Sequence, residues 1–426
     1  MLPIFSLLVA CTPTEQASPS APSAPSAPSA PPVAVAPAAV QEPLVGGPFP
    51  ALLLAQAQFV KDASGKPKPG PALLTIWRKA PDGAWSSTKL EDSESNVFHK
   101  AIATPEGIYT VGAEGAFLKR WNMVGGAWKA EALWNPKWGG KFNRVRDLEI
   151  GDVDGDGKDD LVMATHDMGV VAVGRWKADG TLDVTEFNQQ ADIFVHEIEL
   201  GDVDGDGKNE IYATPSGRNQ SSGKSQPGKV VRSTWNATTS AFDSAVVDDL
   251  GDSHAKEILC ADLDGDKKSE LFSVVEAETA LENGKPKIVR PVEIRQYTAK
   301  KDGTFSHAVV TTLDDLQTRF LVHGDMDGDG AQELVAAAMK SGIWVIKKDA
   351  KDWSAENIER NSSGFEHASW PTDLDGDGKL ELYVASDEQR ELRRYAWNAA
   401  SKVYEKTVIG PIPASTITWN VTSGNL

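Results

Sequence analysis

The sequence predicts an all-β fold, a seven-bladed β-propeller built from four-stranded antiparallel blades. An Asp-rich motif occurs five times, and the first Asp residues of successive copies are 50, 60, 63 and 48 positions apart. A period of about 55 residues is typical of propeller blades and too long for a short solenoid turn. Short apolar and β-branched runs surround each motif, four to a repeat, and four strands make one propeller blade.

The order of the runs is the same in each repeat. A run such as 195–200 precedes the motif, and a run such as 161–165 follows it. A third run, such as 170–176, leads into a fourth, often through an Asp-Gly turn. The motif is therefore expected to connect the first and second strands of five blades.

Two upstream repeats lack the motif and complete the predicted ring. Residues 108–134 contain three runs in the same order, whereas residues 51–90 begin with the second strand. The missing first strand is expected from residues 416–422, so that both parts of the chain close the ring in one blade. From residue 44 onward a repeat of about 55 residues gives about seven blades, with six or eight as alternatives.

The N-terminal segment differs from the rest of the chain. Residues 1–11 form an apolar segment that ends at Cys11 and resembles a bacterial lipoprotein signal, in which Cys11 would carry the lipid. Residues 12–47 are rich in Ala, Pro and Ser and are expected to form a disordered linker before a propeller at 48–426. This predicts a protein of the bacterial cell envelope, lipid-anchored at the outer membrane or surface, or secreted. The alternative is an ordinary apolar N-terminus.

Composition excludes several classes of protein. The formal net charge of -18 argues against nucleic-acid binding, which needs a surplus of Lys and Arg. No apolar run approaches the ~18 residues of a membrane-spanning helix, so only the lipid anchor would contact a membrane. Two Cys residues cannot form a disulfide framework, and Cys260 is expected in the core.

The motif has the chemistry of a calcium loop. Asp at alternate positions of a tight turn directs several carboxylates at one centre, and calcium takes six to eight oxygen ligands. Positions one, three, five and nine offer carboxylates, position seven offers a backbone carbonyl, and Gly at position six permits a positive φ. The predicted ligands are Asp152, Asp154, Asp156, Lys158 and Asp160; Asp202, Asp204, Asp206, Lys208 and Glu210; Asp262, Asp264, Asp266, Lys268 and Glu270; Asp325, Asp327, Asp329, Ala331 and Glu333; and Asp373, Asp375, Asp377, Lys379 and Glu381.

The five motifs resemble the FG-GAP or VCBS repeats of integrin-like propellers over residues 150–426. Position twelve carries no Glu in any copy, which excludes EF-hands. The resemblance implies structural calcium sites at one rim of the propeller. Lys267 replaces Gly at position six of the third motif, so that site is expected to be the weakest. The alternative is that the motifs are Asp-Gly turns without metal.

A second set of residues recurs in register with the motifs. Arg146, His196, Lys256, Arg319 and His367 each stand six residues before the first Asp, and His99 aligns with them. At the start of the inner strands they would encircle the channel mouth opposite the calcium rim. Enlarged loops at 215–229 and 276–291 add basic residues to that face, which predicts an anionic ligand.

Two other interpretations of this ring stay open. In the first, its basic residues pair with the channel acids Glu149, Glu197 and Glu366, and the loops are solvated. In the second, His99, His196 and His367 bind a metal ion.

The predicted function is a calcium-stabilised, monomeric binding module for an anionic polysaccharide or a partner protein. The sequence contains no nucleophile elbow, His-Glu-x-x-His motif or phosphate loop, so an enzyme is not expected. One alternative is a polysaccharide lyase, since the motifs are also similar to runs in rhamnogalacturonan lyases and the basic ring could supply a base and a cation. The other is a structural scaffold without a ligand.

Overall fold

The computed structural model describes residues 49–80, 82–113, 115–139, 143–166, 168–218, 225–349 and 352–426. These residues form strands β1 to β31 and no helix, which confirms the all-β prediction. Within these ranges there is accordingly no helix of the length and hydropathy that a bilayer span requires. Cys11, the predicted signal 1–11 and the predicted linker 12–47 lie outside the described residues.

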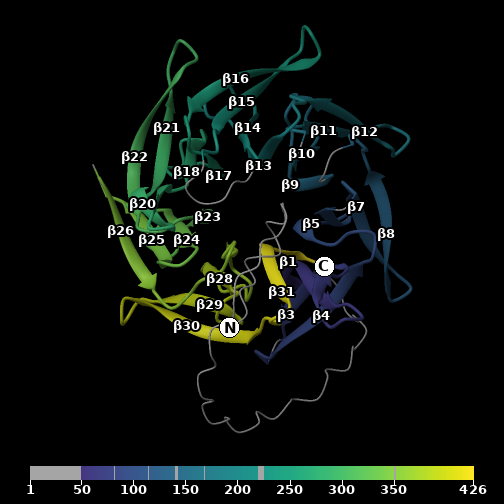
Figure 1. Cartoon of the computed structure of the whole chain (residues 1–426), viewed down its shortest axis with the longest axis vertical. Coiled ribbons are helices and arrows are strands. Elements are labelled where there is room, and N and C mark those ends of the chain that lie inside the picture. The colour runs from purple at the N-terminus through teal and green to yellow at the C-terminus, as the bar shows by residue number, and fades with distance from the viewer. Residues whose placement is uncertain are drawn as a thin grey trace. The chain divides into compact units, whose positions relative to one another are not determined.

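Seven antiparallel sheets surround a central axis, with one strand of each nearest the centre (Figure 1). The predicted seven blades of four strands are therefore confirmed. Blades 2 to 4 are formed, from the inside outward, by β5 (Phe98–Thr104), β6 (Gly107–Gly112), β7 (Leu118–Val124) and β8 (Ala127–Trp134); β9 (Arg144–Gly151), β10 (Asp160–His166), β11 (Val171–Trp176) and β12 (Leu182–Phe187); and β13 (Ile193–Gly201), β14 (Glu210–Gly217), β15 (Lys229–Asn236) and β16 (Ala241–Asp249).

The next three blades continue the same order and meet blade 1 at the end of the chain. The enlarged loop of blade 5 contains a hairpin of its own, β19 (Glu278–Glu282) with β20 (Lys285–Arg290). Blades 5 to 7 are formed by β17 (Ala255–Ala261), β18 (Glu270–Val275), β21 (Val292–Ala299) and β22 (Phe305–Leu313); β23 (Thr318–Gly324), β24 (Glu333–Ala338), β25 (Gly342–Lys348) and β26 (Trp353–Glu359); and β27 (Ser369–Thr372), β28 (Glu381–Ser386), β29 (Glu391–Asn398) and β30 (Val403–Pro411).

Blade 1 closes the ring with strands from both parts of the chain. The inner strand β31 (Thr416–Asn425) pairs antiparallel with β1 (Pro50–Lys61), and Leu54 lies opposite Val421. Strands β3 (Ala72–Lys79) and β4 (Trp85–Asp92) follow outward, while the short β2 (Pro67–Pro69) extends β1 at one end. The predicted closure is thus confirmed.

The core lies between neighbouring blades. Leu52 and Leu54 of blade 1, for example, belong to the same buried cluster as Tyr383 and Ala385 of blade 7. Side chains alternate between the two faces of a strand, so each sheet contributes apolar residues to both adjoining interfaces. Burial of each large apolar side chain contributes about 1.5–3 kcal/mol, so each interface between blades stabilises the propeller.

Carboxylates connect the inner strands across blades. Asp147 Oδ2 accepts the backbone N–H of Ile198 at 2.9 Å, and Asp387 Oδ2 accepts that of Thr418 at 2.8 Å. Glu257 Oε1 likewise accepts the N–H of Leu321 at 3.1 Å. An inner strand is a sheet edge with unpaired N–H groups, and these bonds satisfy some of them. They also position β13, β23 and β31 relative to the neighbouring blades, and hence the side chains that these strands hold at the channel.

Candidate functional site

The five acidic loops lie where the sequence places them, between the inner and second strands of blades 3 to 7. We number them first to fifth in chain order. In every loop one oxygen of the first Asp accepts the N–H of position four at 2.7 Å. Its other oxygen accepts the N–H of position six at 2.8–3.0 Å. Glycine at position six has the predicted positive φ, for example +88° at Gly207.

The folded loops gather carboxylates at one centre. In the second loop one oxygen from each of Asp202, Asp204, Asp206 and Glu210 lies within 4.8 Å of the others. The remaining loops gather the acids of positions one, three and nine: Asp152, Asp154 and Asp160; Asp262, Asp264 and Glu270; Asp325, Asp327 and Glu333; and Asp373, Asp375 and Glu381. Five acidic clusters can therefore bind a metal ion.

The described acids at position five lie mostly outside the clusters. Among the described clusters only the second includes its position-five acid, Asp206. In the first loop Asp156 instead binds the Lys158 side chain at 2.8 Å and accepts its backbone N–H at 2.9 Å. The predicted carbonyl ligands at position seven stay a prediction.

The position-nine acids have raised pKa values. Burial, reinforced by the neighbouring aspartates, raises the pKa of Glu210 and of Glu333 to about 7 and that of Asp160 to about 6. Burial also raises the pKa values of Glu270 and Glu381. A divalent cation would neutralise this crowded negative charge, so the donor set fits a hard metal ion.

A basic side chain of the third strand contacts four of the five clusters. Arg175 Nε lies 2.7 Å from Asp154 Oδ2, and Arg232 lies 3.1 Å from Asp204. Lys347 pairs with Asp327, and Arg394 pairs with Asp375 at 3.3 Å and with Glu381. The motif spacing could not identify these residues, although the sequence has a Lys or Arg in each third strand that could have indicated them.

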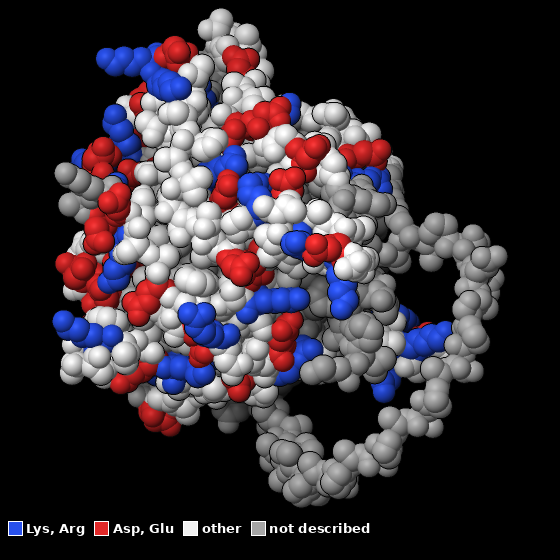
Figure 2. All heavy atoms as spheres, turned by 60° about the vertical axis from the view of Figure 1, so that its left-hand side comes forward, with Lys and Arg blue, Asp and Glu red and all other residues white. Residues whose placement is uncertain are grey.

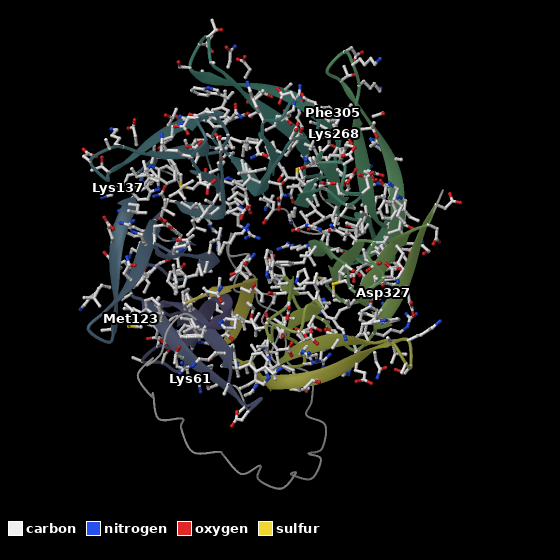
Figure 3. All side chains as sticks on the ribbon, turned by 180° about the vertical axis from the view of Figure 1, so that it is seen from behind. Lys61, Met123, Lys137, Lys268, Phe305 and Asp327 are labelled. Carbon is white, nitrogen blue, oxygen red and sulfur yellow. The ribbon has the colours of Figure 1, made fainter. Side chains whose placement is uncertain are left out.

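The third loop lacks this partner. Among the described residues no third-strand cation pairs with its acids, and the positions in β21 are filled by Gln296 and Thr298. Lys267 takes φ +73°, the strained conformation expected where Gly is absent. The three acids gather all the same, and Figure 3 labels Lys268 and Asp327 of the third and fourth loops on neighbouring blades.

The predicted ring lies at the opposite ends of the inner strands. His99, Arg146, His196, Lys256 and Arg319 fall at or near the first residues of β5, β9, β13, β17 and β23. His367 precedes β27 by two residues. All six side chains are buried.

Ring cations pair with two buried carboxylates. Arg319 contacts Glu366 and lies 3.4 Å from Glu276, while Arg146 lies 3.4 Å from Glu366. Lys256 lies 3.4 Å from Glu276, and burial lowers its pKa to about 8. The pairing with Glu366 was expected. Glu276 was missed because it follows the second strand β18, whereas the prediction considered only the inner strands.

Glu149 and Glu197 were also expected to pair with the basic ring, and the described residues show no such pair. Glu149 pairs with Lys100, outside the predicted ring. No ion pair of Glu197 is seen among the described residues.

His367 has a structural environment. Its Nε2 lies 2.7 Å from Ser362 Oγ and its Nδ1 lies 2.6 Å from the carbonyl oxygen of Ala338. Burial lowers its pKa to about 4. Both ring nitrogens are therefore already bonded within the protein.

Two aromatic residues that the sequence did not single out complete the mouth. His166, the last residue of β10, stacks on Phe194 at 4.4 Å and lies edge-on to His196 at 4.9 Å. Trp419 of β31 packs against His99 at 4.9 Å. Both escaped prediction because only positions six residues before a motif were considered.

Comparison with protein families identifies the repeat. Residues 152–213, which contain the first and second acidic loops, match the FG-GAP-like repeat. The chain is a seven-bladed β-propeller with an FG-GAP-like repeat. A comparison with curated protein sequences finds no match.

Solved structures resemble this FG-GAP-like propeller in fold. A protein of Lactobacillus plantarum is 12% identical with a TM-score of 0.56, and the match covers 88% of this chain and 99% of that one. A candidate 6-phosphogluconolactonase of Bacteroides uniformis is 13% identical with a TM-score of 0.55, covering 89% and 100%. At these identities the likeness concerns the fold alone.

The enlarged loops of the FG-GAP-like propeller are less basic than their Lys and Arg content indicates. Arg218 lies 2.6 Å from Asp192, and Lys287 lies 3.0 Å from Glu282. Figure 2 shows acidic and basic side chains interspersed over the face in view. These contacts balance part of the positive charge of the enlarged loops.

Proposed function

We propose that this propeller is a calcium-stabilised binding module that holds an anionic ligand at the channel mouth. The ligand would be an acidic polysaccharide or the acidic surface of a partner protein. The observation that carries the proposal is the separation of charge along the inner strands, with five carboxylate clusters at one end and Arg146, Lys256 and Arg319 at the other.

Calcium is the metal that the acidic loops favour. Their donors are all carboxylate oxygens, and tight Asp-Gly turns suit a hard cation with six to eight oxygen ligands. Five calcium ions would change the formal net charge from -18 to about -8 and reduce self-repulsion. Since protein oxygens would fill most of each coordination shell, we assign these ions a structural role.

The channel mouth favours a negative ligand for an electrostatic reason. Three buried cations, Arg146, Lys256 and Arg319, are balanced by two acids, Glu276 and Glu366. An uncompensated positive charge acts strongly where water is excluded. The Trp419 ring, next to Arg146, would pack against the ring of a sugar.

The N-terminal segment would place the module at the cell envelope. Acylation of Cys11 would hold it on a bacterial membrane, and the linker at 12–47 would act as a tether. We propose that the propeller works there as a monomer. Mass spectrometry of the membrane fraction would reveal the lipid on Cys11.

The test uses the segment from Leu44 onward, in calcium, against acidic and neutral polysaccharides. We expect binding to acidic polysaccharides alone, and loss of it in Arg319→Gln, with Lys300→Gln in an exposed turn as the control. Circular dichroism would verify that both variants fold. Absence of binding to every acidic polysaccharide and acidic protein would overturn the proposal. An accompanying rise in ultraviolet absorbance from unsaturated sugar ends would assign the protein to the lyases instead.

A further inference from the structure

Four side chains at the channel mouth carry ring nitrogens without a partner. Both nitrogens of His99, both of His166, Nε2 of His196 and Nε1 of Trp419 make no hydrogen bond. Their exposed fractions are 1, 5, 3 and 8%. Buried polar groups are nearly always hydrogen-bonded, so six orphaned nitrogens in one place require an explanation.

The four side chains are neighbours on successive blades. The ring centroids of Trp419 and His99 lie 4.9 Å apart, those of His99 and His166 lie 6.4 Å apart, and those of His166 and His196 lie 4.9 Å apart. They come from β31, β5, β10 and β13, of blades 1 to 4. His166 is paired in register with Arg144 at the start of β9, so it lies at the same end as the inner-strand residues.

The nitrogen chemistry favours a hydrogen-bond acceptor. The indole N–H of Trp419 can only donate, and so can the guanidinium of Arg146, whose Cζ lies 5.4 Å from the Trp419 ring. A neutral imidazole donates through one nitrogen, and a protonated one through both. A ligand that accepts from all these groups has oxygen atoms and a negative charge.

The charges around the site oppose a metal ion. The charged groups that act most on His99 and His166 are Arg144, Arg146 and Lys256, and none of the chief influences is an acid. The nearby acid Glu366 is already paired with Arg146. The histidine nitrogens are also absent from the described groups of three or more metal-ligating atoms within 4.8 Å.

We infer that His99, His166, His196 and Trp419 form a subsite for one oxyanion group, a carboxylate or a sulfate of an acidic glycan. The inference rests on the proposed function and names the group that the channel mouth would recognise. The indole and imidazole N–H groups donate to the anion, and Arg146 supplies charge. No covalent step is involved.

Occupation of the subsite would be coupled to protonation. Burial first, and then the nearby arginines, hold the pKa values of His99 and His166 well below the usual range, and the pKa of His196 is lowered by burial and then by His166. An anion between them raises these pKa values, so binding takes up protons. The surrounding charged and titratable groups are Arg144, Arg146, His254, Lys256, Glu276, Arg319 and Glu366.

Calorimetric titration of the calcium-loaded protein with D-glucuronate and with inorganic sulfate tests the inference. Both probes are ionised at pH 6 and at pH 8, so any protons taken up on binding would be taken up by the protein. We expect about tenfold tighter binding at pH 6, and heats that change with the ionisation enthalpy of the buffer. The tighter probe identifies the group as carboxylate or sulfate.

A matched pair of variants locates the site. His166→Phe retains the stack on Phe194 and removes two nitrogens, and it should weaken binding about tenfold and reduce proton uptake. His307→Phe, on the outer strand β22 with its side chain 37% exposed, should change neither. If His166→Phe fails to fold, Trp419→Phe removes the indole N–H instead.

Two results overturn the inference. The first is that neither probe binds. The second is that a probe binds without proton uptake and that its affinity is the same for His166→Phe as for the wild type. If acidic polysaccharides still bind in either case, the proposed function stands and only this subsite is wrong. If acidic polysaccharides fail as well, both are wrong.

Discussion

The second acidic loop allows the role of calcium to be tested with a single atom-for-atom change. Asp204 is one of four acids in this cluster, and its carboxylate accepts a hydrogen bond from Arg232 at 3.1 Å. Asp202, by contrast, accepts three backbone N–H groups and shapes the loop itself. Asp204→Asn therefore removes the charge of a proposed metal ligand while the turn keeps its hydrogen bonds.

The expected effect follows from linkage. Calcium at 100 times its dissociation constant stabilises the fold by about 2.7 kcal/mol per site. Unfolding of residues 49–426 has an entropy of about 0.8 kcal/mol/K, so one site raises Tm by about 3 °C and five sites raise it by about 17 °C. If Asp204→Asn weakens its site about 100-fold, the calcium-induced rise falls by about 3 °C.

In the absence of calcium the same substitution should act differently. Asp204 raises the pKa of Glu210 by repulsion, and its removal relieves this repulsion. The ion pair with Arg232 is partly exposed and contributes about 0–1 kcal/mol. Melting in a chelator should therefore change by about 1 °C or less.

Differential scanning calorimetry with calcium and with chelator measures both effects. Asp183→Asn, an exposed acid of β12, makes the same change in charge outside the loops and serves as the control. Equal wild-type melting temperatures in the two conditions would refute the calcium assignment. A variant that melts lower by the same amount in both would show that Asp204 has only a structural role.

Three further predictions concern the acidic loops and the closure of the propeller. Without calcium, the free energy of unfolding should fall as the pH rises from about 4.5 to about 7, because Glu210 and Glu333 keep their protons to a higher pH when folded than when unfolded. Thermal melting in chelator from pH 5 to pH 8 checks this. An unchanged melting temperature would contradict it. Lys267→Gly should stabilise the protein by about 0.5–1 kcal/mol by relieving the positive φ, measured by urea unfolding, and a lower midpoint would disprove the strain. A chain that ends at Pro413 lacks β31 and should lose cooperative melting, whereas a sharp transition would show that closure is dispensable.

The fold could be predicted because it repeats. Five motifs with a constant relation to the surrounding β runs indicated the order of strands in a blade, and the runs at 51–90 and 416–422 indicated how the ring closes. Hairpin β19–β20 and strand β2 were not predicted, since they are insertions that follow no period.

The candidate sites could be predicted only in part. Ligands at positions one, three and nine follow from the loop's own geometry, and the structure brings them together. Contacts that cross strands or blades depend on distances that a motif does not encode. This explains why Arg175 beside Asp154, Glu276 beside Lys256, and His166 beside His99 were missed.

We propose that the five acidic loops are calcium sites. Calcium-binding stoichiometry tests it most directly, by equilibrium dialysis of the chelator-stripped propeller followed by elemental analysis. We predict five calcium ions per chain for the wild type and four for Asp204→Asn. A wild-type protein that retains no calcium at millimolar concentrations would contradict the claim.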